Sequence, residues 1–315
     1  MFNLEVEQNV PLAPFTTWKI GGPAKFFVAV KTIKELEKAL AFAKSQKLKV
    51  FVLGGGSNIL VSDSGFSGLV VKIELNDLEI DKTKVRVQAG VPMGRLAASC
   101  MQHNLAGLEW AVGIPGTVGG AVFGNSNCFG GSTGQRLQAA LLLTPAGKLK
   151  QVTKDYFNFS YDYSILQETG EIVLEVIFEL DQVSPKQMAE RREKILETAA
   201  CRFRTQPLGE KCAGSVFKAL SQKPELIQKL SQKRIDWEQG LRDGFISAGF
   251  IIDKGLGLKG YRLEKMKISD KHANFFINLG GASAANAKKL IDFVKKECKN
   301  KLDIILEEEI KYVGF

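Results

Sequence analysis

The stretch VFVLGGGSNILVSD, residues 50–63, is the part of the chain from which the fold can best be inferred. Its first four residues form a continuous apolar run, which is typical of a strand covered on both faces. Three glycines follow. Ordered glycine loses much backbone entropy, so a fold retains it where φ is positive or where another group leaves no room for a Cβ. Successive N–H groups in such a turn can bind a phosphate, with Ser57 and Asn58 as further donors. A tight turn between two strands would explain the same glycines.

A second glycine-rich stretch, GIPGTVGGAVFGN, covers residues 113–125. Two such loops in one chain suggest a long ligand held at both ends, and a dinucleotide has a suitable length. Neither loop fits a GxxxxGK[ST] phosphate loop or a strand–GxGxxG–helix fingerprint. These patterns therefore argue against a P-loop ATPase and against a Rossmann NAD domain.

Length and composition indicate a globular protein of more than one lobe. At 315 residues the chain exceeds the usual size of a single hydrophobic core, so we expect two or three lobes. The formal charge of +9 would permit nucleic-acid binding, but Lys and Arg are scattered among acidic residues rather than gathered into a stripe. We therefore expect no nucleic-acid partner, and we interpret the basic excess as steering of anionic small substrates.

The termini, apolar runs and cysteines bear on location and metal content. The start, MFNLEVEQN, has no basic-then-apolar signal pattern, and no apolar run approaches the roughly 20 residues of a membrane-spanning helix. Five widely spaced cysteines and only two histidines, His103 and His272, argue against a disulfide framework and a zinc site. We expect a cytoplasmic monomer with no membrane insertion and no metal.

Periodicity along the chain predicts three lobes. A strand at 24–30, a helix that begins with a Thr32/Glu35 capping box and the strand at 50–53 would form a small parallel lobe. Short apolar segments from 69 to 180, with a helix near 93–103, predict a sheet-rich lobe, and a helix from Ser184 to about Arg204 follows. A strand near 272–278 and a helix over 284–299 belong to the third lobe. We place the lobes at 1–66, 67–205 and 206–302, with a C-terminal strand in 303–315 returning to the first.

The segment 219–247 is longer than we expect at this place in the chain. Leu226, Leu230 and Ile235 have the spacing of an amphipathic helix. Such a helix is either a surface elaboration of the third lobe or a face that binds a partner.

Five motifs together resemble one known family. TTWKIGGPA (16–24), GGGSNILVSD (54–63), GLEWAVGIPGTVGGAVFGN (107–125), AGSVFK (213–218) and LEEEIKYVG (306–314) are similar to the UDP-N-acetylenolpyruvoylglucosamine reductases, the MurB family, in the family's order and across nearly the whole chain. The resemblance implies an α+β protein: an FAD-binding fold of the vanillyl-alcohol-oxidase/PCMH type in two lobes, followed by a C-terminal substrate-binding α+β lobe.

The resemblance also implies a cofactor and a reaction. FAD would bind through its pyrophosphate at the first loop and through its flavin at the second. NADPH would reduce the flavin, which would pass a hydride to UDP-N-acetylglucosamine enolpyruvate, giving UDP-N-acetylmuramate for peptidoglycan synthesis. The cofactor-binding residues implied in this way are Gly54, Gly55, Gly56, Ser57, Asn58, Ile114, Pro115, Gly116, Thr117, Gly119, Gly120 and Asn125.

Two residues match the family's catalytic positions. Ser215 matches a serine that donates a proton to the substrate, and Glu309 matches an acidic residue near the C-terminus. A hydroxyl is a weak acid, so Ser215 needs a buried position near positive charge, for which Lys218 is a candidate. Tyr161 and Lys218 are the implied substrate-binding residues.

Two positions depart from the family's pattern. Where the family has Tyr-Arg-x-Ser, this chain has Tyr161-Asp162-Tyr163-Ser164, which replaces a cation expected to bind the substrate carboxylate with an acid; Arg202 or Arg204 could compensate. Ala219 stands where the family has a polar contact. These departures leave two alternatives to the reductase: a flavin-binding paralogue with weak or no turnover, or a related FAD oxidase acting on another carbohydrate.

Overall fold

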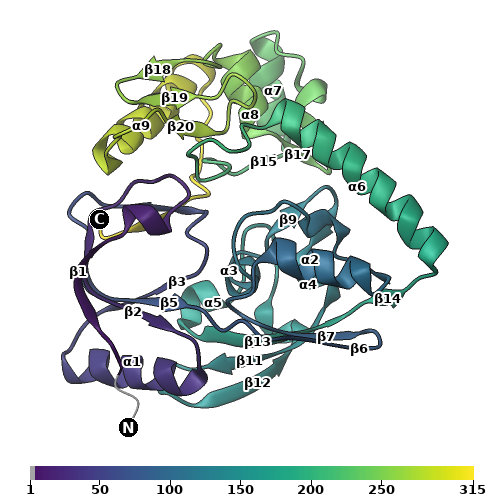
Figure 1. The fold of residues 1–315 in the computed structure, drawn as a ribbon. Helices are drawn as coiled ribbons and strands as arrows, with labels where there is room; N and C mark the ends of the chain where they lie inside the picture. Colours follow the sequence, from purple (N-terminus) through teal and green to yellow (C-terminus); the bar gives the residue numbers. More distant parts are fainter. Residues whose placement is uncertain (1–3) are drawn as a thin grey trace. The chain divides into compact units, whose positions relative to one another are not determined.

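The computed structural model describes residues 4–315, and its chain divides into two compact units. The first unit comprises the residues up to 10, 24–55 and 67–201, and the second comprises 11–23, 56–66 and 202–315. Both contain helices and strands (Figure 1), so the protein is an α+β protein, as predicted.

The first unit contains a four-stranded sheet whose strand order is β1-β2-β5-β3. The predicted helix is present as α1, with the Thr32/Glu35 capping box, and it buries Leu36, Ala39 and Ala43. The run 50–53 forms β3 and pairs in parallel with β5. The prediction of a fully buried strand is wrong, because only Leu53 is buried, Phe51 and Val52 are half-buried and Val50 is 37% exposed. This strand also lies at the edge of its sheet. The bounds are β1 Glu7–Pro11, β2 Pro23–Val30, α1 Ile33–Ser45, β3 Val50–Leu53 and β5 Phe66–Ile73.

A five-stranded antiparallel sheet of order β12-β11-β13-β7-β6 forms the rest of the first unit's core. Helices α2 and α3 lie along this sheet (Figure 1), and Leu96 and Val118 join Val87 and Phe178 in one buried cluster. The helix predicted near 93–103 is confirmed as α2. The bounds are β6 Leu78–Asp81, β7 Lys84–Gln88, α2 Met93–Gln102, β8 Leu105–Ala106, η2 Glu109–Ala111, α3 Val118–Phe123, β9 Asn127–Cys128, β10 Gly131–Ser132, α4 Thr133–Arg136, β11 Leu137–Leu143, β12 Leu149–Thr153, η3 Lys154–Phe157, α5 Leu166–Thr169, β13 Ile172–Glu179 and β14 Asp181–Gln182.

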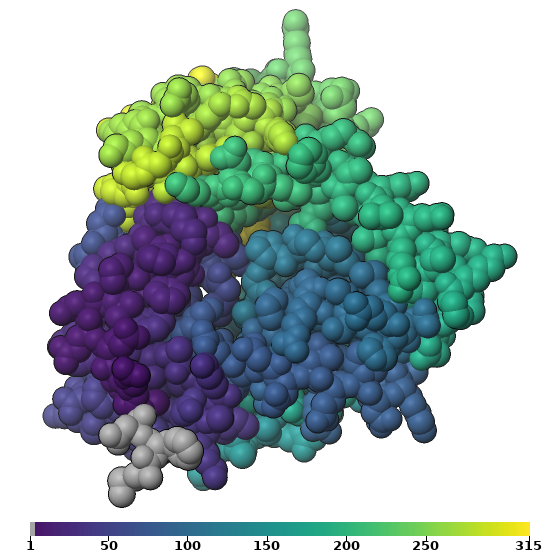
Figure 2. Space-filling model, viewed as in Figure 1, coloured from purple at the N-terminus to yellow at the C-terminus, as the bar shows by residue number. Residues whose placement is uncertain are grey.

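Helix α6, Pro185–Thr205, confirms the helix predicted after Ser184. The Ser184 hydroxyl accepts a hydrogen bond from the Gln187 N–H at 3.2 Å, as an N-cap does. Most residues of α6 are exposed (Figure 2, teal-green), with Leu196 at 69%, whereas Met188 and Arg202 are buried. Neither α6 nor any other helix in residues 4–315 is long and apolar enough to cross a membrane.

The second unit packs helix α9 and small sheets around its own core. Phe217, Phe276 and Leu290 lie in that core, and Ser283 caps α9 through a capping box with Asn286, so the predicted cap is confirmed. Near the C-terminus, β21 pairs in parallel with β4. The bounds are η1 Ala13–Phe15, β4 Ile59–Val61, β15 Leu220–Ser221, α7 Pro224–Gln232, η4 Trp237–Gly240, β16 Leu241–Arg242, β17 Phe245–Ile246, α8 Ala248–Phe250, η5 Ile251–Gly255, β18 Arg262–Leu263, β19 Met266–Ile268, β20 Phe276–Asn278, α9 Ala284–Leu302 and β21 Lys311–Val313.

Candidate active site

The two glycine-rich loops meet within the first unit. A Cβ added to Gly55 would lie 2.5 Å from the Cα of Gly116, and one added to Gly54 would lie 2.7 Å from Oγ1 of Thr117. Both glycines are thus required by the close approach of the second loop. The Lys72 ammonium group donates a hydrogen bond to the Gly54 carbonyl from the neighbouring strand β5. Burial lowers the pKa of Lys72 and Glu74 opposes that shift.

The second loop leads into the N-terminus of α3. Thr117 caps this helix by accepting a hydrogen bond from the Gly120 N–H at 3.4 Å. The N–H groups of Val118 and Gly119 donate to the carbonyls of Val91 and Ala89 at 2.9 and 2.8 Å. These bonds fix the loop to the end of β7. Ile114 and Gly116 are half-buried, whereas Pro115 and Gly120 are exposed.

Asn125, at the end of α3, has a structural role in addition to any contact with a ligand. Its side chain is 8% exposed, donates to the Ser160 carbonyl at 2.9 Å and accepts from the Gly134 N–H at 3.0 Å. Asn125 therefore ties the second loop to the residue that precedes Tyr161.

The remainder of the first loop, from Gly56 onward, belongs to the second unit. Gly56 has φ +62°, and a Cβ there would lie 2.1 Å from the Phe15 carbonyl oxygen. Its own carbonyl accepts from the Thr17 N–H at 3.0 Å. Thr17 Oγ1 is buried and has no hydrogen-bond partner among residues 4–315. Sequence reasoning missed Thr17, although it lies in the quoted motif TTWKIGGPA.

The first loop has the donors that a pyrophosphate requires. Within residues 4–315, neither the Gly55 N–H nor the Gly56 N–H donates to a protein acceptor. Gly56 is buried and Gly55 is half-buried, and successive N–H groups without a protein acceptor can bind an anion. The Gly56 N–H and the unpartnered Thr17 hydroxyl, both in the second unit, are donors of the kind that a pyrophosphate requires.

Asn58 connects the first loop to the C-terminal motif. Its Nδ2 donates to the Glu309 carbonyl at 3.3 Å, and its carbonyl accepts from the Lys311 N–H at 3.0 Å. Asn58 was predicted as a phosphate donor. The side-chain amide has a second N–H, so the contact with Glu309 leaves that prediction open.

The structure brings Ser215 and Glu309 onto neighbouring extended segments of the second unit. The Glu309 N–H donates to the Val216 carbonyl at 2.8 Å, and the Lys218 N–H donates to the Glu307 carbonyl at 2.8 Å. Ser215, Lys218 and Glu309 are all half-buried. The hydroxyl, the ammonium group and the carboxylate predicted for catalysis are therefore carried by one continuous set of backbone pairings.

Asn274 holds the serine-bearing segment and was missed by sequence reasoning. This residue is 5% exposed, and its Oδ1 and Nδ2 pair with the N–H and carbonyl of Phe217 at 3.0 and 2.8 Å. Its backbone carbonyl accepts from the Val216 N–H at 2.9 Å. No spacing in the sequence could reveal this pairing, because Phe217 and Asn274 lie far apart in the chain.

His272 supports Asn274 in its neutral form. Its Nδ1 accepts from the Asn274 N–H at 3.3 Å. Burial, followed in importance by the Lys259 charge, lowers the pKa of His272. A lowered pKa keeps Nδ1 unprotonated and able to accept.

The segment that departs from the family's pattern lies in the first unit. Tyr161 is 37% exposed, whereas Asp162 is 7% exposed and has φ +50°. The Asp162 carbonyl accepts from Gln167 Nε2 at 2.9 Å. In the second unit Arg202 is buried and donates to Gln206 at 3.4 Å, and Arg204 is exposed.

The comparisons with known proteins agree on one family. An FAD binding domain matches residues 24–153, and the C-terminal domain of UDP-N-acetylenolpyruvoylglucosamine reductase matches residues 206–313. A UDP-N-acetylenolpyruvoylglucosamine reductase of Bacillus cereus is 38% identical over 313 residues, covering 97% of this chain and 94% of the relative. This chain belongs to the UDP-N-acetylenolpyruvoylglucosamine reductase family.

Further members of the family match over their full length. The reductase of Halalkalibacterium halodurans is 37% identical over 312 residues, covering 98% of this chain and 95% of the relative. The crystal structure of the reductase from Thermus caldophilus has a TM-score of 0.79 at 30% identity, covering 99% of this chain and 100% of that one. The predicted family and the predicted FAD-binding fold are both confirmed.

Proposed function

We propose that this protein reduces UDP-N-acetylglucosamine enolpyruvate to UDP-N-acetylmuramate with FAD as its cofactor and NADPH as its reductant, a step of peptidoglycan synthesis. Full-length similarity to the reductase family supports the assignment. The observation that carries it is the pairing of the Ser215 and Glu309 segments, with 2.8 Å between the Glu309 nitrogen and the Val216 oxygen. Bound FAD would supply hydride transfer to the enolpyruvyl group.

Cofactor binding would use both glycine loops. The unpaired N–H groups of Gly55 and Gly56 and the Thr17 hydroxyl would bind the pyrophosphate, and Ser57 and Asn58 would add side-chain donors. On the second loop, Ile114, Pro115, Gly116, Thr117, Gly119, Gly120 and Asn125 remain the predicted flavin-binding residues.

Proton delivery would be the task of Ser215. Reduction of the enolpyruvyl group places negative charge on the carbon next to the substrate carboxylate, and that carbon must receive a proton. We assign the proton to the Ser215 hydroxyl, and Lys218, three residues further along the same segment, stays the predicted cation that would favour its loss. Glu309 would share a proton with the substrate carboxylate, and Tyr161, in the first unit, stays a predicted substrate-binding residue. We also propose that the protein acts as a cytoplasmic monomer.

The test compares NADPH oxidation with and without UDP-N-acetylglucosamine enolpyruvate in the purified yellow protein. We expect oxidation to depend on that substrate. We expect Ser215→Ala to lower kcat by about 10²- to 10⁴-fold, the usual contribution of a general acid, while NADPH still reduces the flavin. Ser231→Ala, at an exposed position on α7, is the matched control. Wild-type turnover by Ser215→Ala would contradict the assigned role.

Asp162 favours one alternative, a paralogue that binds flavin with little turnover. A buried carboxylate replaces the arginine that the family's pattern has at this position. Slow NADPH oxidation that does not respond to the enolpyruvyl sugar would support the paralogue. The second alternative, an FAD oxidase, would instead consume oxygen with a carbohydrate and leave the enolpyruvyl sugar unchanged.

A further inference from the structure

The segment 219–247, set aside above as a surface elaboration or a partner face, forms one wall of a cavity in the second unit. The predicted helix is confirmed as α7, whose Leu226 and Leu230 are buried in the core, but Ile235 lies beyond its end at Gln232. The Lys229 ammonium group at its C-terminal end forms an ion pair with Asp303 at 2.8 Å, just after α9. The segment is therefore fixed against α9.

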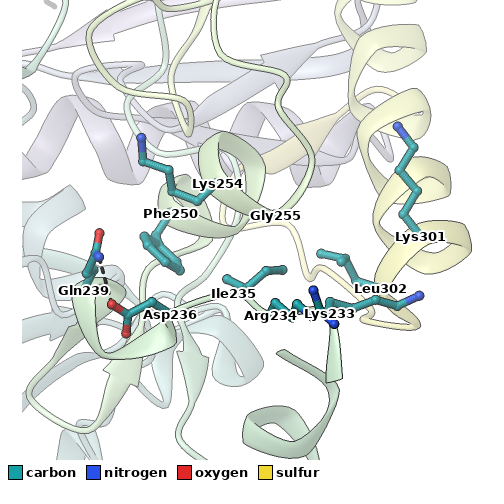
Figure 3. Close-up of a pocket in the computed structure, with 10 residues that line it drawn as sticks. All are labelled: Lys233, Arg234, Ile235, Asp236, Gln239, Phe250, Lys254, Gly255, Lys301 and Leu302. Carbon is teal, nitrogen blue, oxygen red and sulfur yellow. Dashed lines mark hydrogen bonds between the residues drawn. The ribbon is translucent and has the colours of Figure 1, made fainter. Parts of the chain in front are cut away.

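Three parts of the second unit line this cavity, which has a volume of about 440 Å³. The cavity is a hollow open to solvent rather than an enclosed space, with a volume within the roughly 300–1,000 Å³ of small-molecule clefts. Figure 3 shows its side chains: the lining comes from the end of α7 and the residues after it, from the helical run 248–255 and from the end of α9. The lining residues are Lys233, Arg234, Ile235, Asp236, Gln239, Phe250, Lys254, Gly255, Lys301 and Leu302.

The middle of the cavity is apolar. Ile235 and Leu302 point toward one another below Gly255, and the Phe250 ring lies beside them (Figure 3). A Cβ on Gly255 would lie 2.9 Å from Leu302 Cδ1 and 3.5 Å from Ile235 Cδ1. Leu302 and Ile235 therefore pack directly against the Gly255 backbone, where a side chain would clash.

The rim of the cavity is basic. It carries four cations, Lys233, Arg234, Lys254 and Lys301, against one carboxylate, Asp236, which accepts from Gln239 at 2.9 Å. In the part of the chain that the structure describes, no ion pair or side-chain hydrogen bond involves Lys233 or Arg234.

Two of the four cations have acidic neighbours. Lys301 pairs with Glu297 at 2.9 Å, and Lys254 lies 3.8 Å from Asp253. Lys233 and Arg234 are thus the cations whose charge is least compensated.

The balance of charge around the cavity limits the charge that its ligand can carry. Helix α7, the run 248–255 and α9 all end at this lining, and each helix C-terminus carries about half a negative charge. These ends, Asp236 and the two acidic neighbours offset much of the basic charge. The remaining excess matches an anion of one or two charges better than a polyphosphate or a nucleic acid. A phosphate monoester carries about 1.5 to 2 negative charges at neutral pH.

We propose that this cavity is a binding site for a small phosphate monoester that carries a flat or apolar group. The phosphate pairs with Lys233 and Arg234, and the organic part contacts the half-buried Phe250 and Ile235. Arg234 can bind two phosphate oxygens at once, and Lys233 adds a point charge. The site is separate from the Ser215 and Glu309 segments, and the proposal does not depend on the reductase activity.

The test titrates the FAD-containing protein with adenosine monophosphate by calorimetry, with and without saturating UDP-N-acetylglucosamine. We expect binding in both conditions, weakened by salt and at least tenfold weaker in Lys233→Gln/Arg234→Gln. The matched control, Lys194→Gln/Lys296→Gln, removes two exposed lysines elsewhere and should bind as the wild type does. Adenosine should bind more weakly than the monophosphate, and so should inorganic phosphate.

Several results would overturn the proposal. Loss of binding when UDP-N-acetylglucosamine is present would assign the nucleotide to the substrate site. Unchanged binding by Lys233→Gln/Arg234→Gln, the pocket variant, would also assign the nucleotide to the substrate site. No binding, with a lowered Tm in the pocket variant, would mean that Lys233 and Arg234 only compensate the helix ends. Tighter binding of a single-stranded oligonucleotide than of the monophosphate would indicate a polyanion instead.

Discussion

Gly55→Ala tests whether the contact between the two glycine loops is required for cofactor binding. The added Cβ would lie 2.5 Å from Gly116 Cα and 3.2 Å from its backbone nitrogen and carbon. These are backbone atoms, so no rotamer change can relieve the clash. Ordinary contact begins at 3.4 Å, and the two loops must therefore separate by about 0.9 Å, the difference between 3.4 and 2.5 Å.

The size of the effect follows from this displacement. Overpacking of a well-packed site costs about 1–3 kcal/mol. If FAD binds only when the loops are in contact, the cost falls on FAD binding and weakens it roughly 5- to 150-fold, since each 1.4 kcal/mol is a factor of about ten. If the loops separate both in the FAD-bound and in the FAD-free protein, the same cost lowers the free energy of unfolding instead.

Flavin absorbance and thermal unfolding together distinguish these outcomes. We expect purified Gly55→Ala to contain less FAD per chain than the wild type and to require more added FAD for saturation. Gly94→Ala is the control, because a Cβ on Gly94, in α2, meets no atom within 4 Å. Stoichiometric FAD and an unchanged Tm in Gly55→Ala would refute the loop contact as a determinant of binding.

Variants at three further positions test the residues that support the site. Asn274→Ala leaves the buried N–H and carbonyl of Phe217 without side-chain partners, at a cost of about 1–3 kcal/mol for each group. Urea denaturation should therefore show that the free energy of unfolding falls by about 2–5 kcal/mol, and kcat should fall as well. Unchanged stability would contradict the role of Asn274 in holding the serine-bearing segment. His272 has a lowered pKa in the folded protein. Its contribution to stability should therefore be full above about pH 6.5 and be lost as the pH falls toward the folded-state pKa. The Tm of His272→Gln should vary less between pH 8 and 5 than the Tm of the wild type. Asp162→Arg should lower Tm while Asp162→Asn should not, because the buried position has φ +50°, which asparagine tolerates well. Equal Tm values for the two variants would show that the backbone at this position does not limit the choice of side chain.

Local signals predicted most elements of the fold. The Thr32 and Ser283 caps, the Ser184 start of α6 and the apolar spacing of α7 are each encoded within a few residues, so α1, α6, α7 and α9 could be predicted. The exposure of β3 could not be predicted from the sequence. A short apolar run has the same composition in a central strand as in an edge strand, and only the strand order distinguishes the two.

The candidate site shows the same division between local and distant information. Ser215 and Glu309 were found because each lies in a motif, but their adjacency depends on backbone pairing between distant segments. Asn274 is a single polar residue before an apolar strand and carries no motif. The two glycine loops were interpreted as holding two ends of a ligand, yet Gly55 and Gly116 are in contact, which is a property of tertiary packing.

Asp162 shows how the structure changes the interpretation of a sequence difference. From sequence, the residue is a reversal of charge at a substrate-binding position, and Asp162→Arg would be its direct reversion. In the structure the residue is 7% exposed with φ +50°, and its Oδ1 lies 3.7 Å from the position that a Cβ on Gly124 would occupy. A left-handed residue with a long side chain costs about 1–2 kcal/mol, and a buried guanidinium needs a partner. Low activity in Asp162→Arg would therefore not show that the charge is harmless. Asp162→Asn removes the charge and keeps a residue type that tolerates this backbone, so a rise in kcat/KM in that variant alone would establish that the carboxylate opposes the substrate.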